Sequence, residues 1–257
     1  MFVDSHCHLD RIDLTPFDHR FESFMEATSQ AEISGMLCVS IDLESWPAMC
    51  ALVEPWDNVW VSVGVHPNED ADTPLSVEDL INRANNPRVV AIGETGLDYF
   101  RSGRGEDWQH QRFVTHIKAA KQLNKPVIIH TREARDDTMD ILEREGADAC
   151  GGVMHCFVED WATAKRALDL GFYISFSGVL TYKSAAELRE IAKKLPRERI
   201  LIETDSPYLA PVPHRGKPNY PYHVRHIAEV LAEVRGERLH AVADYTTANF
   251  HQLFRIS

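Results

Sequence analysis

The sequence predicts a single (β/α)8 barrel of the TIM type over residues 1–257, and three observations lead to this prediction. Short apolar runs with the character of strands recur eight times, with helical stretches between them. This alternation requires parallel strands, because parallel neighbours are joined by crossover helices. The chain is close to the about 250 residues of such barrels, and histidine or carboxylate side chains follow most of the runs.

The expected elements alternate in order along the chain. We expect strands at 2–5, 36–39, 59–65, 89–92, 126–129, 152–154, 172–176 and 200–202. Helices are expected at 17–33, 44–55, 77–84, 106–123, 134–145, 161–170, 185–195, 224–234 and 240–254. Runs of Val, Ile and Leu indicate strands that are covered on both faces. A doubly wound open sheet is the alternative fold, but no Gly-x-Gly-x-x-Gly follows the first strand, which weakens its dinucleotide-binding form.

Composition and charge exclude several functional classes. A formal net charge of −12 opposes non-specific adhesion to nucleic acid over the whole surface, although bound cations can dominate a local pocket. No run approaches the roughly 20 apolar residues of a membrane helix. The five cysteines are odd in number and form no Cys-x-x-Cys pair, so we expect free thiols. The chain starts without a basic or apolar leader, and we expect a cytoplasmic protein that is a monomer or a weak oligomer.

The segment from Asp4 to Asp10 contains a candidate pair of metal ligands. His6 and His8 are two residues apart, so on a strand both imidazoles point to the same face and Cys7 points to the other. This arrangement suits two nitrogen atoms that bind one metal ion, with bonds of about 2.0–2.1 Å.

Further candidate ligands follow the other strands and would meet at one rim of the barrel. They are His66, Glu94, His130, His155, Glu203 and Asp205. Even four of these five histidines with two of the three carboxylates exceed what one catalytic zinc needs, and they suit two ions roughly 3.5–4 Å apart that share a bridging carboxylate. Nitrogen and oxygen ligands allow Zn²⁺, Mn²⁺ or Mg²⁺. A nucleophilic triad is less convincing, because no Gly-x-Ser-x-Gly elbow is present.

These motifs together resemble the TatD-type metal-dependent deoxyribonucleases of the amidohydrolase superfamily. The resemblance lies in Asp4–Asp10, Gly64-Val65-His66-Pro67, Gly93–Tyr99, Ile129–Ala134, His155-Cys156-Phe157 and Glu203–Pro211, and it covers essentially the whole chain in order. It implies a two-metal hydrolase that cuts DNA phosphodiester bonds, often as a 3′→5′ exonuclease.

The resemblance also implies a role for each site residue. His6, His8 and Asp205 would hold one ion, His130 and His155 the other, and Glu94 would bridge the two. Asp205 would orient the attacking water, while Glu203 and His66 would line the site as supporting or proton-handling groups. Tyr220 replaces the glutamate of a family loop that ends Asn-Glu-Pro, which puts any role of that carboxylate in doubt here.

Basic and aromatic residues near the expected ligands favour a phosphate substrate. Arg101, Arg104, Arg132, Arg135, His214, Arg215 and Lys217 follow the ligand segments. Of these we predict that Arg101, Arg132, Arg135 and Arg215 bind substrate phosphate, since arginine can hold phosphate with two hydrogen bonds. Unpaired bases could stack on Tyr99, Phe100, Phe157, Tyr182 or Tyr208.

The leading hypothesis is therefore a two-metal enzyme that acts on single-stranded or frayed DNA ends. A second hypothesis keeps the barrel and the metals but changes the bond to a cyclic amide, a lactone or the ester of a D-aminoacyl-tRNA, because metal-activated water serves all of these. A third hypothesis is a non-catalytic binding protein in which the metal is a structural clip, and the complete set of ligands disfavours it.

Overall fold

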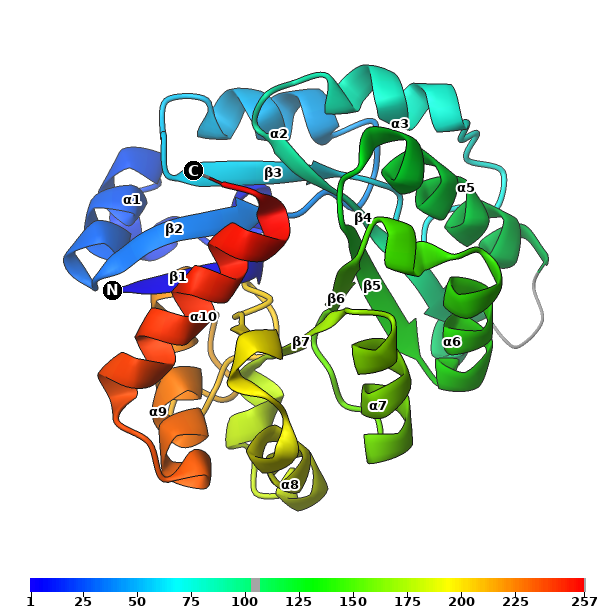
Figure 1. Ribbon diagram of the computed structural model, residues 1–257. Coiled ribbons are helices and arrows are strands. Elements are labelled where there is room, and N and C mark those ends of the chain that lie inside the picture. Colours follow the sequence, from blue (N-terminus) through cyan, green and yellow to red (C-terminus); the bar gives the residue numbers. More distant parts are fainter. Residues whose placement is uncertain (103–106, 257) are drawn as a thin grey trace.

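The computed structural model describes residues 1–102 and 107–256, and eight parallel strands form its centre (Figure 1). They follow one another around a single sheet in chain order. The strands are β1 (Phe2–Cys7), β2 (Ile33–Cys38), β3 (Val59–Val63), β4 (Val89–Asp98), β5 (Val127–Arg132), β6 (Gly152–Met154), β7 (Tyr173–Phe176) and β8 (Ile200–Ile202). The barrel predicted from the sequence is confirmed.

The barrel closes between β8 and β1 just beyond the short strand β8. Cys7 and Ser206 form an isolated parallel bridge there. The amide of Asp205 donates to the carbonyl of His6 at 2.9 Å, and the amide of His8 donates to the carbonyl of Ser206 at 2.8 Å. These bonds hold the segment after β8 against the segment that carries His6 and His8.

Helices cover the outside of the barrel (Figure 1). They are α1 (Phe21–Gln30), α2 (Trp46–Val53), α3 (Val77–Ala84), α4 (Tyr99–Ser102), α5 (Asp107–Leu123), α6 (Arg135–Arg144), α7 (Trp161–Asp169), α8 (Ala186–Lys194), α9 (Val224–Arg235) and α10 (Leu239–Phe254). Among the described residues, none of the helices combines the length and apolarity needed to cross a membrane.

Both faces of the strands are buried, as the apolar runs predict. Met36 and Cys38 pack outward against the helices, whereas Leu37 belongs to a second cluster. Phe250 and Phe254 of α10 join this second cluster. Because α10 also contacts β1 and the turn that precedes β8, it covers the amino ends of these strands. The carboxyl ends of the strands remain as the rim on which a site can form.

Several boundaries differ from those expected from the sequence. The helix expected at 17–33 begins only at Phe21, because Asp18 and His19 have positive φ angles of 54° and 56° that interrupt a helix. Strands β4 and β5 run to Asp98 and Arg132, so Glu94 and His130 lie within strands rather than after them. Arg104 and the first residue of the helix expected at 106–123 lie outside the described residues.

Candidate metal centre

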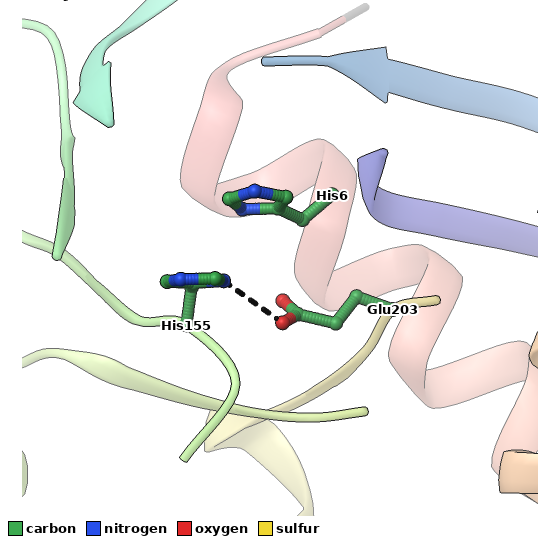
Figure 2. Close-up of side chains that lie close together, drawn as sticks. All are labelled: His6, His155 and Glu203. Carbon is green, nitrogen blue, oxygen red and sulfur yellow. Dashed lines mark hydrogen bonds and ion pairs between the residues drawn. The ribbon is translucent and has the colours of Figure 1, made fainter. Parts of the chain in front are cut away.

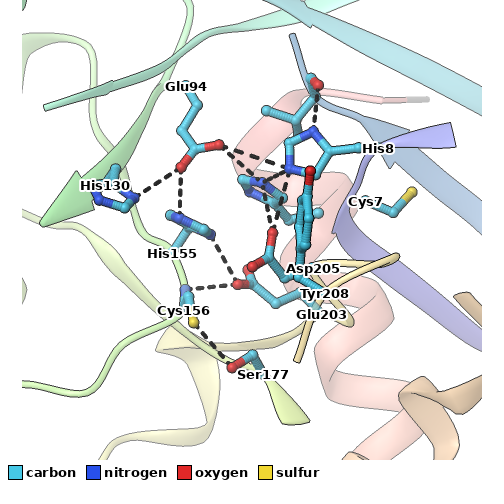
Figure 3. A network of polar contacts seen from close by, with 12 residues as sticks. Cys7, His8, Glu94, His130, His155, Cys156, Ser177, Glu203, Asp205 and Tyr208 are labelled. Atoms are coloured by element: carbon cyan, nitrogen blue, oxygen red, sulfur yellow. Dashed lines mark hydrogen bonds and ion pairs between the residues drawn. The ribbon is translucent and has the colours of Figure 1, made fainter. Parts of the chain in front are cut away.

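The carboxyl ends of the strands bring the predicted ligands together on one rim (Figure 3). His6 lies on β1, Glu94 on β4 and His130 on β5, while the other candidates follow directly after strands. Cys7 is turned away from the cluster and donates its thiol to the Leu37 carbonyl, as the strand alternation predicts.

His6, His8 and Asp205 form the first ligand group. The Nε2 atoms of His6 and His8 are 3.3 Å apart. Asp205 Oδ1 is 3.6 Å from the former nitrogen and 3.4 Å from the latter. With metal–nitrogen bonds of about 2.0–2.1 Å, two ligands on a tetrahedral ion are separated by about 3.3–3.4 Å. The three atoms therefore have the spacing needed to hold one ion.

His66, His130 and His155 form the second ligand group around one oxygen of Glu94. Glu94 Oε1 is 2.9 Å from His155 Nε2, 3.1 Å from His130 Nδ1 and 3.4 Å from His66 Nε2. The sequence predicts a supporting role for His66. Its Nε2, however, lies as close to the shared carboxylate as expected for two ligands of the same metal ion. His66, Glu94 and His130 could together hold a second ion.

Glu94 lies between the two groups and presents a different oxygen to each. Its Oε2 is 3.3 Å from His6 Nε2 and 4.0 Å from His8 Nε2, while Oε1 faces the second group. Burial alone would raise the pKa of Glu94, but the surrounding histidines hold it well below its usual value. The carboxylate is thus ionised and has the placement of a bridge.

The second ligand group has carboxylates behind its histidines. His155 Nδ1 is 3.0 Å from Glu203 Oε1 (Figure 2), and His130 Nε2 is 3.2 Å from Asp98 Oδ2. Such partners fix the tautomer and orientation of a metal-binding histidine, so that its other nitrogen carries the lone pair. Burial lowers the pKa of both imidazoles, but the neighbouring carboxylates outweigh it and raise the pKa of His130 and His155 in the metal-free protein.

Asp98 is a buried residue that sequence reasoning missed. In addition to His130, its side chain accepts hydrogen bonds from Asn68 Nδ2 at 2.8 Å and from the Arg101 amide at 3.1 Å. Burial opposes ionisation of Asp98, but these donors keep its pKa below the usual value. A signal was available, because residues 94, 96 and 98 share one face of a strand.

Glu203 is better placed as a partner of His155 than as a ligand. Its Oε1 also accepts the amide of Cys156 at 2.7 Å. Although His6, His155 and Glu203 lie close enough to hold an ion, the two imidazole rings are stacked at 4.0 Å with only 15° between their planes (Figure 2). Lone pairs of ring nitrogens lie in the ring plane, so two nearly parallel rings do not aim at one point.

The first ligand group has weaker support behind its histidines. His8 Nδ1 is 2.9 Å from the carbonyl oxygen of Val39. Among the described residues, the buried Nδ1 of His6 has no hydrogen-bond partner. Burial would raise the pKa of Asp205, but His8 and His6 lower it, so the group carries an ionised carboxylate of its own.

The predicted phosphate-binding arginines lie at the surface around this rim. Arg132 stacks on Phe100 at 3.8 Å, and Arg215 lies over Tyr182 at 4.3 Å. Arg135 is partly neutralised by Asp160 at 3.1 Å, and Arg101 is exposed on α4. A cavity of about 590 Å³ is lined by Tyr99, Arg132, Glu133, Ala134, Arg135, Asp136, Asp137, Val158 and Glu159. It opens beyond the carboxyl ends of β5 and β6.

The aromatic residues proposed for base stacking differ in exposure, and Tyr182 is partly buried beneath Arg215. Phe157 is 2% exposed and Tyr99 8%, so the prediction that their rings are available to bases is wrong. Phe100 and Tyr208 are about half exposed, and Tyr208 packs edge-on against His8. Tyr220 packs against Phe17, and its hydroxyl donates to the Asp13 carbonyl at 3.1 Å. It therefore stabilises the core at the position where family loops carry a glutamate.

Comparisons with known proteins agree with this geometry. The family model described as TatD related DNase matches residues 3–255. An uncharacterized metal-dependent hydrolase of Escherichia coli K12, YcfH, is 48% identical over 254 residues, which cover 99% of this chain and 96% of YcfH. The 3′-5′ ssDNA/RNA exonuclease TatD of Shigella flexneri is 35% identical over 233 residues, 88% of this chain and 90% of that protein.

A solved structure has nearly the same fold. The TatD homolog YJJV from Escherichia coli K12 superimposes with a TM-score of 0.89 at 30% sequence identity, over 100% of this chain and 98% of the other. The chain therefore belongs to the TatD related DNase family of metal-dependent hydrolases.

Proposed function

We propose that the protein binds two divalent cations and hydrolyses phosphodiester bonds at nucleic-acid ends, as a 3′→5′ exonuclease on single-stranded or frayed DNA. One observation carries the proposal: Glu94 presents one oxygen to each of two histidine groups. This is the arrangement that a two-metal hydrolytic site needs. The fit extends to the donor set, which consists of nitrogen and oxygen atoms suited to Zn²⁺, Mn²⁺ or Mg²⁺.

The residues around the two ion positions would have different roles in hydrolysis. When bound, two divalent ions would supply Lewis acidity and activate water for attack on phosphorus. Asp205 is ionised, and its side chain is 13% exposed, so it can accept a proton from water at the open side of the rim. His66 is 16% exposed and can therefore also exchange protons with solvent. Glu203 and Asp98 hold His155 and His130 in position.

Surface residues around the rim favour a nucleic-acid end. Arg132 and Arg215 offer guanidinium groups that form no ion pair among the described residues. Phe100 and Tyr208 offer exposed rings on which unpaired bases can stack. The name of the Shigella flexneri relative, a 3′-5′ ssDNA/RNA exonuclease, supports the same substrate class. An acidic chain repels the rest of a long polyanion, which favours contact with an end.

An activity panel on the purified protein tests the proposal. The metal-free protein is supplied with Mg²⁺, Mn²⁺ or Zn²⁺ and offered 5′-labelled single-stranded DNA, duplex DNA, RNA and D-aminoacyl-tRNA. We expect stepwise shortening of single-stranded DNA from its 3′ end that requires a divalent ion and is lost in Glu94→Ala. If D-aminoacyl-tRNA were the only substrate cleaved, the site would be one for ester hydrolysis instead. Full nuclease activity without metal would contradict the proposal.

A further inference from the structure

A cluster of three histidines lies outside the metal centre, where the loop after β8 meets α9. His214 belongs to the loop, His223 ends a short turn and His226 lies in the first turn of α9. The Nε2 atoms of His214 and His226 are 3.2 Å apart. This distance is close to the 3.3 Å that separates the same atoms of His6 and His8 in the first ligand group.

We propose that His214 and His226 form an auxiliary site for a borderline transition-metal ion such as Zn²⁺, separate from the two-metal centre. Two nitrogen ligands on a tetrahedral ion are separated by about 3.3–3.4 Å, so the pair needs little movement to hold one. Both side chains are partly exposed, so water can complete the coordination. Nitrogen ligands without carboxylate oxygens favour Zn²⁺, Cu²⁺ or Ni²⁺ over Mg²⁺.

The surroundings of the pair resemble those of a built metal site. His226 Nδ1 is 3.1 Å from Glu229 Oε2, which favours a proton on Nδ1 and leaves Nε2 with the lone pair. His214 stacks on His223 at 4.0 Å with 8° between the rings, and His223 Nδ1 lies 2.9 Å from Asn219 Oδ1. The orientation of the His214 ring is therefore supported from behind by a buried residue.

The charges around the cluster are mixed. Glu229 favours a bound cation, while Lys217 and Arg225 oppose it, although Arg225 is paired with Glu229 and Glu32 at 3.1 and 3.2 Å. Burial and the neighbouring His226 lower the pKa of His214, and burial lowers that of His223 to about 3. Neutral imidazoles at pH 7 are the form that binds metal. An ion here would fasten the loop that carries Arg215 to α9.

Equilibrium dialysis against Zn²⁺ alone, followed by metal quantification, tests the site. We expect wild-type protein to bind one more Zn²⁺ per chain than His226→Gln and than His214→Gln. His240→Gln, an exposed position on α10, is the matched control and should bind as wild type does. Excess Mg²⁺ should not displace the additional Zn²⁺.

A second measurement distinguishes zinc bound by the histidine pair from zinc bound at the metal centre. Thermal unfolding with and without Zn²⁺ should show a larger increase in Tm for wild type than for His226→Gln, because an ion that binds only the native state stabilises it. The Mg²⁺-supported activity of His226→Gln should equal that of wild type. Equal zinc content in wild type, His226→Gln and His214→Gln would overturn the proposal and leave a hydrogen-bonded histidine pair.

Discussion

The two ligand groups of the candidate metal centre place their negative charge differently. In the first group Asp205 stands among the ligand atoms, and among the described residues the histidines are supported from behind only by the carbonyl of Val39. In the second group all the residues other than the shared Glu94 are histidines, and Asp98 and Glu203 lie one step behind them. Because Coulomb attraction falls with distance, a carboxylate in contact with an ion stabilises it more than one behind an imidazole. We therefore expect the loss of metal binding to be larger when a carboxylate among the ligand atoms is removed than when one behind a histidine is removed.

Removing Glu94 should have the largest effect, because both groups share it. In Glu94→Ala we expect kcat to fall by at least about 10²-fold and the content of bound divalent ions to fall with it. Steady-state kinetics and metal analysis of the same preparation check this. Glu26→Ala, at an exposed position on α1 away from the rim, is the control. Near-normal kcat with normal metal content in Glu94→Ala would show that the assignment is wrong.

Removing Asp205 should affect mainly the first group. We expect Asp205→Asn to lower kcat by at least about 10²-fold as well, but to lose one ion per chain rather than both. Native mass spectrometry or metal analysis distinguishes the two outcomes. Loss of both ions would mean that the two positions are not occupied independently.

Removing Asp98 should weaken the second group without emptying the first. Loss of a partner behind a metal-bound histidine costs about 10–100-fold in metal affinity or activity. We expect Asp98→Asn to lose affinity for one ion in that range, measured by competition with a chelator. Asn68→Ala, which removes one donor to Asp98, should have a smaller effect in the same direction. Unchanged metal affinity in Asp98→Asn would show that Asp98 does not support metal binding through His130.

The pH dependence should separate the metal-free protein from the loaded one. The raised pKa of His155 contributes stability below about pH 6.5, the unfolded value, and this is lost as pH rises through the folded pKa. The lowered pKa of Glu94 contributes stability above the unfolded value of 4.5, and this is lost as pH falls through the folded pKa. Since metal must displace the histidine protons, the increase in Tm caused by Mn²⁺ should be larger at pH 8 than at pH 5.5. Thermal unfolding at both pH values checks this, and an equal or opposite difference would contradict it.

The smallest effect is expected at the surface arginines. Arg215→Gln should raise KM for single-stranded DNA more than it lowers kcat, whereas Glu94→Ala should do the reverse. A few phosphate contacts predict a shallow log–log salt slope of about −1.5 to −3. Cleavage of 5′-labelled DNA at several salt concentrations measures both, with Arg197→Gln near the amino end of β8 as the control. Salt-independent cleavage would favour an amide or ester substrate instead.

The hydrophobic pattern of the sequence predicted the fold well. It predicted poorly how far the strands continue into the polar rim at their carboxyl ends. Helix Val77–Ala84 and strands Gly152–Met154 and Ile200–Ile202 have the predicted bounds. Strands β4 and β5 extend beyond their apolar parts, because polar residues of the rim, among them Glu94, Asp98 and His130, lie on the strands themselves. An apolar run cannot reveal a strand that continues into a metal centre.

The candidate site was predictable as far as its residue types, but not in its surroundings. His6, His8, Glu94 and Asp205 come together as expected. The partnership of Asp98 with His130 joins two strands, and the burial of Phe157 depends on long-range packing. The strand alternation could place Asp98 on the face of Glu94, but no local pattern shows that His130 is its partner or that Phe157 is buried.

Anomalous diffraction from crystals loaded with Mn²⁺ tests most directly whether Glu94 bridges two ions. We expect two peaks roughly 3.5–4 Å apart, one among His6, His8 and Asp205 and the other beside His130. One oxygen of Glu94 should contact each peak. A single peak, or two peaks of which Glu94 touches only one, would show that Glu94 does not bridge two ions.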